Sequence, residues 1–383
     1  MRARERLQSL ARTPQLLWNV LLRARYDFIY DQMPVSVRRM SLAKRVNLFK
    51  AGGNLVRRRL APWSWPLHMN IELTNYCDLR CPICPTGARE MSRRPEAMPV
   101  GLFERLMAEV GPYLLTASLW DWGEPLLHPQ LADILHVARK YPVATLLSTN
   151  GQKLNDDRII NALITHPPTF LIVAIDGLTD ETNSRFRTGA RLEPALSGVR
   201  RLAELKRQNA LKLPLLHMRY IPMKHNEHEV PLVSDFAREA GFDQATIRTL
   251  SIIDAPEQPH QELIPDAKDL RAYAYENSRR VRRDDFVCME PFWFPAIYAD
   301  GTVTGCDQDY NAQQPMGSLS GGASFADIWS SRQAAGVRRL IRDTSQKLSF
   351  CANCPYTDRP ISHCSIEALN LHQPGQPIPP IQI

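Results

Sequence analysis

Six short apolar runs alternate with helical patterns through the middle of the chain. The runs predict strands at residues 70–75, 114–120, 143–148, 169–175, 213–221 and 244–249. Amphipathic patterns between them predict helices near residues 99–111, 130–140, 154–165, 193–208 and 228–240, and Gly241 is expected to end the last one. Because strands that alternate with helices form parallel sheets covered by helices, we expect an α/β fold, a partial (β/α)6 TIM-like barrel. Residues that carry chemistry are then expected at the carboxyl ends of the strands.

The pattern changes on both sides of this barrel. Residues 1–60 hold 14 Lys and Arg against 3 Asp and Glu, and residues 1–65 predict a basic helical N-terminal extension. After the barrel, Asp300-Gly301 predicts a hairpin turn, and residues 326–342 predict a helix. We divide the chain into the extension 1–65, the barrel 66–255, a linker 256–287, a small cysteine-containing module 288–370 and a Pro-rich tail 371–383.

We expect the protein in the cytoplasm, because of its composition, its N-terminal sequence and its cysteine spacing. The chain has 44% hydrophobic and 23% charged residues, which is typical of a globular protein. The apolar run at Leu16–Leu22 is too short for a signal peptide, and no segment approaches the length of a membrane span. The eight cysteines fall in two groups, with closely spaced pairs that indicate metal ligands rather than disulfides.

The first cysteine group directly follows the first predicted strand of the barrel. Cys77, Cys81 and Cys84 have the spacing C-x3-C-x2-C. Short loops of closely spaced cysteines bind [4Fe–4S] clusters, and three ligands leave one iron open for another molecule. On spacing alone, a zinc site with a fourth ligand from elsewhere remains an alternative.

Further motifs stand at the following strand ends. Trp122-Gly123-Glu124-Pro125 follows the second strand, Ser148-Thr149-Asn150-Gly151 the third, and Asp176-Gly177 the fourth, before Arg185-Phe186-Arg187. Together with the cysteines, these motifs resemble the radical S-adenosylmethionine (SAM) superfamily over about residues 70–255. Trp122 stands where the family often has glycine, and Ile83 where it usually has an aromatic residue.

This resemblance implies a reaction and a set of cofactor contacts. A reduced [4Fe–4S] cluster on Cys77, Cys81 and Cys84 would give one electron to SAM, and the resulting 5′-deoxyadenosyl radical would take a hydrogen atom from a substrate C–H bond. An external reductant of the flavodoxin or ferredoxin type would supply the electron. Residues at the strand ends would bind SAM, and of Arg185 and Arg187 we favour Arg187. The cofactor-binding set is Trp122, Gly123, Glu124, Pro125, Ser148, Asn150, Asp176 and Arg187.

The second cysteine group resembles the SPASM/Twitch extension, which holds auxiliary iron–sulfur clusters. The resemblance implies one auxiliary [4Fe–4S] cluster on Cys288, Cys306, Cys351 and Cys354. Structural zinc is the alternative for these four cysteines. Cys364 is then left over, and we expect it to be a catalytic hydrogen-atom donor, a ligand or a buried structural residue. The first role would make the protein an epimerase, whereas the others favour a dehydrogenase that passes an electron through the auxiliary cluster.

The substrate is less closely determined by these motifs. Twitch-bearing relatives favour a polyol or carbohydrate-containing substrate, and the basic extension is consistent with a lipid-linked one and with peripheral contact at the inner membrane surface. Nucleic acid is not the expected partner. One rival interpretation is a SPASM-type maturase of a ribosomal peptide. A rival of another class is a zinc-stabilised protein whose basic extension binds nucleic acid.

Overall fold

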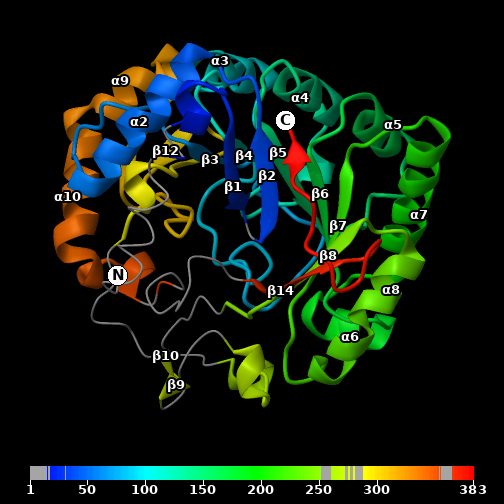
Figure 1. The fold of residues 1–383 in the computed structure, drawn as a ribbon. Coiled ribbons are helices and arrows are strands. Elements are labelled where there is room, and N and C mark those ends of the chain that lie inside the picture. Colours follow the sequence, from blue (N-terminus) through cyan, green and yellow to red (C-terminus); the bar gives the residue numbers. More distant parts are fainter. Residues whose placement is uncertain are drawn as a thin grey trace.

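The computed structural model describes residues 15, 18–30, 32–251, 260–271, 275–276, 279–280, 288–352, 354 and 365–383. Its centre is a parallel sheet that forms a partial barrel (Figure 1). The barrel strands are β3 (His68–Ile71), β4 (Thr116–Ser118), β5 (Ala144–Thr149), β6 (Phe170–Ala174), β7 (Leu215–Tyr220) and β8 (Gln244–Arg248). Each strand pairs in parallel with the next, so all six predicted strands are confirmed.

Helices cover the outside of this sheet (Figure 1). They are α3 (Val100–Val110), α4 (Leu131–Ala138), α5 (Asp157–Thr165), α6 (Asp180–Phe186), α7 (Leu192–Gln208) and α8 (Val233–Ala240). Their apolar stripes face the sheet, as in α3, where Leu102, Phe103 and Leu106 are buried. Gly241 ends α8 with φ +92°, a left-handed conformation that glycine adopts without strain, as predicted.

The sheet continues into the C-terminal cysteine-containing part. There β11 (Ala296–Ile297) pairs in parallel with β3, and β12 (Thr302–Thr304) and β13 (Pro315–Ser318) extend the same sheet in antiparallel fashion. At the opposite edge, β14 (Ser365–Asn370) pairs antiparallel with β8. The predicted hairpin at Asp300-Gly301 is confirmed, with Gly301 at φ +86°. A separate two-stranded pair consists of β9 (Tyr275–Glu276) and β10 (Arg279–Arg280).

Two predictions of secondary structure are wrong. The extension is not wholly helical, because β1 (Tyr26–Tyr30) and β2 (Met33–Val37) form a hairpin before helix α2 (Leu42–Arg57). The predicted helix at 326–342 is two helices, α9 (Phe325–Ser330) and α10 (Arg332–Thr344), followed by the short α11 (Ser349–Ala352). Ser331 separates them, because its extended backbone ends α9 while its side chain accepts a hydrogen bond from the backbone of Ala334.

The hairpin lines the inside of the barrel instead of forming a separate arm (Figure 1). Met33, Val35 and Val37 are buried against inward-facing barrel residues such as Leu146 and Phe170. The far end of the chain joins it, since β15 (Ile381–Gln382) pairs in parallel with β2. The extension and the tail therefore complete the core of the barrel.

Helix α2 is attached to the barrel by polar contacts. The Lys44 side chain is 1% exposed, and its Nζ donates to the backbone carbonyls of Leu114 at 2.7 Å and Pro142 at 2.6 Å. These carbonyls precede β4 and β5, so one buried ammonium holds α2 against two barrel loops. Within the described part of the chain, no helix combines the length and apolar character that crossing a membrane requires.

Candidate active site

The loop that follows β3 carries the first three cysteines. Cys81 is buried, Cys77 and Cys84 are half-buried, and all three belong to one small cluster around Leu79. The backbone N–H of Leu79 donates to Sγ of Cys77 at 3.4 Å. Gly87 lies against the backbone of Cys81, where a Cβ would come within 2.5 Å of the carbonyl oxygen. The loop is therefore tightly folded around its thiols.

The donors of this loop suit an iron–sulfur cluster. Among the described residues, no three or more His, Cys, Asp or Glu side chains are grouped to hold a single metal ion. In a cubane cluster each cysteine binds a different iron, so three thiols need not converge on one point. Burial raises the pKa of Cys77 to about 12 and of Cys81 to about 11, and a bound metal would displace both protons. Three such thiols fit a cluster with one open iron.

Glu124 lies at the carboxyl end of β4, beside the cysteine loop. Its side chain is buried, and its carboxylate accepts hydrogen bonds from the Thr149 hydroxyl at 2.7 Å, the Asn150 backbone at 2.8 Å and the Leu126 backbone at 3.0 Å. The Leu126 bond makes Glu124 the cap of the short 3-10 helix that starts at Pro125. Burial raises the pKa of Glu124 to about 7. The carboxylate thus joins the ends of β4 and β5.

Gly123 explains why the chain can turn so closely here. A Cβ at this position would lie 2.0 Å from the backbone oxygen of Thr74, which no side chain tolerates. The Thr74 hydroxyl in turn donates to the backbone oxygen of Glu124 at 2.8 Å. The predicted motif at the end of β4 is therefore held directly on the strand end that carries the cysteines.

Asn150 connects the third strand end to the cysteine loop. Its Nδ2 donates to the carboxylate of Asp78 at 2.7 Å and lies 3.6 Å from Sγ of Cys77. Ser148 is half-buried on the same strand, two residues earlier. Thr149 was missed by the sequence analysis, although it stands between the two predicted residues and hydrogen-bonds Glu124. The structure therefore brings the second and third motifs together around Glu124 and Cys77.

Asp176 and Arg187 form the fourth predicted part of the site. Arg187 Nε donates to Asp176 at 2.7 Å, and the Asp176 carboxylate also accepts from the Ile221 backbone at 2.8 Å. Burial opposes the charge of Arg187, but Asp176 and the neighbouring Cys81 raise its pKa above the ordinary value. Arg187 thus lies beside the cysteine loop, fixed by a fully buried carboxylate.

Trp122 links this strand-end site to the C-terminal module. Its indole Nε1 donates to the backbone oxygen of Asp307 at 2.8 Å, and its ring meets Tyr310 edge-on with centroids 5.8 Å apart. Its own backbone oxygen accepts from the Thr86 hydroxyl in the cysteine loop. The radical SAM superfamily often has glycine at this position. In this chain, Trp122 instead connects the two cysteine-containing regions.

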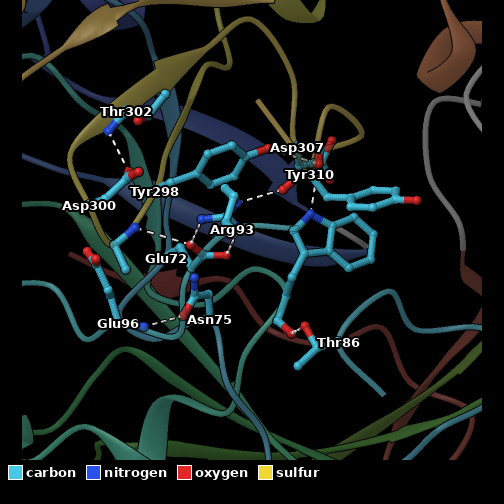
Figure 2. A network of polar contacts seen from close by, with 12 residues as sticks. Glu72, Asn75, Thr86, Arg93, Glu96, Tyr298, Asp300, Thr302, Asp307 and Tyr310 are labelled. Carbon is cyan, nitrogen blue, oxygen red and sulfur yellow. Dashed lines mark hydrogen bonds and ion pairs between the residues drawn. The ribbon is translucent and has the colours of Figure 1, made fainter. Parts of the chain in front are cut away.

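A buried ion pair strengthens the same junction (Figure 2). Both terminal nitrogens of Arg93 donate to the carboxylate of Glu72, at 2.6 and 2.7 Å, and its Nε donates to the Tyr310 backbone at 2.6 Å. The guanidinium lies 3.9 Å from the ring centroid of Tyr298, and the Ala299 backbone donates to Glu72 at 3.1 Å. No sequence motif identified this pair, which joins β3, the cysteine loop and the hairpin between β11 and β12.

The second cysteine group also gathers in space. Cys306 and Cys354 are buried, and Cys288 and Cys351 are half-buried. Burial raises the pKa of Cys306, and so does its electrostatic interaction with Cys288 and Cys354. Burial likewise raises the pKa of Cys288, which interacts electrostatically with Cys354 and Cys351. Cys288 is thus within electrostatic range of the other three thiols, an arrangement that fits a cluster with a cysteine on every iron. Cys364, the fifth cysteine of this group, lies outside the described residues.

The comparisons with known proteins agree with this arrangement. Residues 71–236 match the family model of the radical SAM superfamily, and residues 288–355 match SPASM, an iron–sulfur cluster-binding domain. The chain is 21% identical to a tungsten-containing aldehyde ferredoxin oxidoreductase cofactor-modifying protein from Pyrococcus furiosus, over 76% of this chain and 88% of that protein.

Two further relatives carry the name PqqA peptide cyclase. The Gluconobacter oxydans protein is 21% identical over 80% of this chain and 87% of its own length. The Xanthomonas campestris pv. campestris protein is 23% identical over 82% and 86%. Among solved structures, Streptococcus suis SuiB bound to S-adenosylmethionine matches the fold with a TM-score of 0.58, at 16% identity, over 84% of this chain and 81% of that one.

The two matched domains imply three kinds of cofactor: SAM, a [4Fe–4S] cluster and auxiliary iron–sulfur clusters. Both domains include the cysteines that the structure gathers, and their order agrees with the predicted order of barrel and module. The chain therefore contains a radical SAM domain at residues 71–236, followed by a C-terminal SPASM domain at residues 288–355.

Proposed function

We propose that this protein is a radical SAM enzyme that modifies a peptide by removing a hydrogen atom from one of its C–H bonds. The observation that carries the proposal is the alignment with peptide cyclases, which spans about four fifths of the chain and more than four fifths of each relative. These relatives favour the peptide interpretation over a polyol, carbohydrate or lipid-linked substrate. They give no support to epimerisation or dehydrogenation of such a substrate.

The strand-end residues would bind the first cluster and SAM. Cys77, Cys81 and Cys84 would hold the catalytic cluster, which together with SAM would supply the radical chemistry. Glu124 and Arg187 would bind the charged groups of the methionine part of SAM, and Ser148 and Asn150 would bind SAM from the end of β5. Because the Glu124 carboxylate already accepts three hydrogen bonds, it also fixes the relative positions of β4 and β5.

The second cysteine group has a distinct role in the proposal. Cys288, Cys306, Cys351 and Cys354 would hold an auxiliary cluster through two buried and two half-buried thiols. Trp122 and the pair of Arg93 with Glu72 fix this module against the SAM-binding strand ends. A cluster bound there would supply a site that accepts an electron from the substrate, and the first cluster would need an external one-electron reductant.

Asp121 marks the place where a peptide would meet the protein. It lies three residues after β4, next to Trp122, and its pKa is raised by burial, by Asp307 of the module and by Cys84 of the first cysteine loop. One carboxylate oxygen, Oδ2, is buried and has no hydrogen-bond partner. A buried polar oxygen without a partner is costly, so a substrate that brings a hydrogen-bonding group is favoured there. A peptide backbone offers such groups at every residue.

The test uses the anaerobically reconstituted full chain. It is incubated with SAM, a reductant and synthetic peptides encoded by short reading frames next to its own gene, and peptide masses and 5′-deoxyadenosine are measured together. The proposal expects a peptide that loses hydrogen and stimulates 5′-deoxyadenosine formation, and neither effect with the Cys77/Cys81/Cys84→Ala variant. Stimulation by sugars or polyols, with no peptide changed, would return the polyol interpretation to first place.

A further inference from the structure

Exposed apolar side chains are concentrated in one part of the surface. Among the described residues, ten large hydrophobic side chains are exposed, and nine of these lie between residues 18 and 63. The tenth, Leu232, is far along the chain on the segment before α8. Single exposed apolar residues are ordinary, but their concentration in one segment indicates an interaction surface.

Helix α2 shows how this surface is built. Apart from the small Ala51, its buried residues are polar: Lys44, Asn47 and Asn54. Lys44 donates to two barrel carbonyls, Asn47 exchanges hydrogen bonds with the backbone of Trp65, and Asn54 donates to Ser64 at 2.6 Å. These contacts fix the rotation of the helix about its axis.

The apolar residues of α2 consequently face outward. Leu42, Val46, Phe49 and Val56 are 67, 43, 39 and 87% exposed. They follow one another at steps of four, three and seven residues, so they form a single stripe along the helix. We call these four residues the outer stripe. A helix with hydrogen-bonded polar residues inside and an apolar stripe outside is the reverse of an ordinary surface helix.

Basic residues border the outer stripe on both sides. On a helical projection Arg45 lies to one side, and Lys50 and Arg57 lie to the other. Residues 41–59 contain six Lys and Arg and neither Asp nor Glu. Apolar residues flanked only by cations match the interface of an anionic bilayer, where lysine and arginine reach phosphate groups while apolar side chains enter the acyl boundary.

The neighbouring helical turn adds to this surface. Arg45 Nη1 donates to the backbone oxygen of Leu21 at 2.7 Å, which places Leu21 beside the first half of α2. Leu21 and Leu22 are 49 and 66% exposed, and Trp18 is 55% exposed. Tryptophan is enriched where membranes meet water, because its ring is apolar and its N–H is polar.

We propose that the outer stripe, with Trp18, Leu21 and Leu22 beside it, docks the protein on the surface of an anionic lipid bilayer. Charge complementarity favours a bilayer over a second copy of this chain, because the copy would bring the same cations against each other. The docking is peripheral, and α2 lies in the membrane plane. It is independent of the substrate, since the stripe belongs to the extension and not to the strand-end site.

The experiment is co-sedimentation of the full chain with vesicles of phosphatidylglycerol and phosphatidylethanolamine, and with vesicles of phosphatidylcholine alone. The wild type should pellet with the first, pellet weakly with the second, and dissociate at high salt because salt screens the cations. V46E/F49E/V56E should lower the bound-to-free ratio at least about tenfold, since three apolar contacts are lost. L232E changes an equally exposed leucine outside the surface and should bind like the wild type.

Two further measurements make the outcome decisive. K50Q/R57Q keeps the outer stripe and should lose the preference for phosphatidylglycerol. All variants are compared with the wild type in far-UV circular dichroism and SAM cleavage, which should be unchanged because every substituted residue is exposed. The proposal fails if the wild type stays in the supernatant with anionic vesicles at low salt. It also fails if V46E/F49E/V56E converts a lipid-free dimer into a monomer, which would assign the stripe to a second copy.

Discussion

Replacing Arg93 tests the junction between the barrel and the SPASM domain. In R93M the Glu72 carboxylate, whose side chain is fully buried, keeps only the Ala299 backbone donor at 3.1 Å. The variant loses two charge-assisted bonds to Glu72, the bond to the Tyr310 backbone and the contact with the Tyr298 ring. Removing one partner of a buried ion pair costs about 3–5 kcal/mol, and we expect R93M to lose this much free energy of unfolding.

The remaining carboxylate also makes the effect depend on pH. Burial raises the pKa of Glu72 even with Arg93 in place, and without Arg93 the pKa rises further. A folded-state pKa above the unfolded value stabilises the fold at low pH, and this stabilisation is lost as pH rises through the folded-state pKa. The loss caused by R93M should therefore be smaller near about pH 5 than near about pH 8.

Urea unfolding of the apo chain, followed by circular dichroism, measures both effects. R105M changes an exposed arginine and should stay within about 0.5 kcal/mol of the wild type. E72M/R93M removes both charges and should lose less than R93M alone, because no unpaired buried charge remains. A double variant as unstable as the sum of E72M and R93M, or an R93M variant equal to R105M, would contradict this account of the junction.

Three further substitutions test other contacts. K44M should lower the free energy of unfolding by about 1–3 kcal/mol, because two carbonyls lose their donor. Burial lowers the pKa of Lys44 to about 8. In urea titrations above that pH, the free energy of unfolding of the wild type should therefore increase relative to that of K44M. W122F removes the bond to Asp307 and should reduce peptide modification more than SAM cleavage in a paired assay. G123A forces a Cβ against Thr74 and should abolish SAM cleavage, with the iron content of the purified protein unchanged.

The barrel was predictable because its signals are local. Each strand is a short apolar run, and the residues after it, such as Glu124 and Asn150, could be assigned by their position at a strand end. The structure places these two residues in direct hydrogen-bond contact. Gly241 likewise acts as the helix end that its position indicated.

The connections between distant segments were not predictable in this way. In the sequence, Glu72 and Arg93 are 21 residues apart and belong to no motif. Their partners Tyr298 and Tyr310 reach them only through the fold. Trp122 looked like a departure from a glycine motif, but its indole reaches the other cysteine region. Such contacts depend on how the sheet continues, which neither periodicity nor spacing specifies.

The N-terminal error has a different cause. The extension was predicted as helical, yet Tyr26, Phe28 and Tyr30 alternate with more exposed residues at the period of a strand. The run is only five residues long, so its alternation is a weak signal within the longer basic segment. On α2 the outward apolar stripe is equally misleading, because helices usually bury such a stripe.

The pairing of β15 with β2 bears on how this chain acquires its structure during synthesis. The backbone N–H of Ile383 donates to Ser36 at 3.0 Å, and that of Arg38 donates to the Ile383 oxygen at 2.9 Å. Contacts between residues so far apart in sequence slow folding, since a long loop must close before they form. The lining of the barrel therefore remains incomplete on the ribosome until residue 383 has emerged, and a nascent chain shorter than this should expose part of β2 to chaperones.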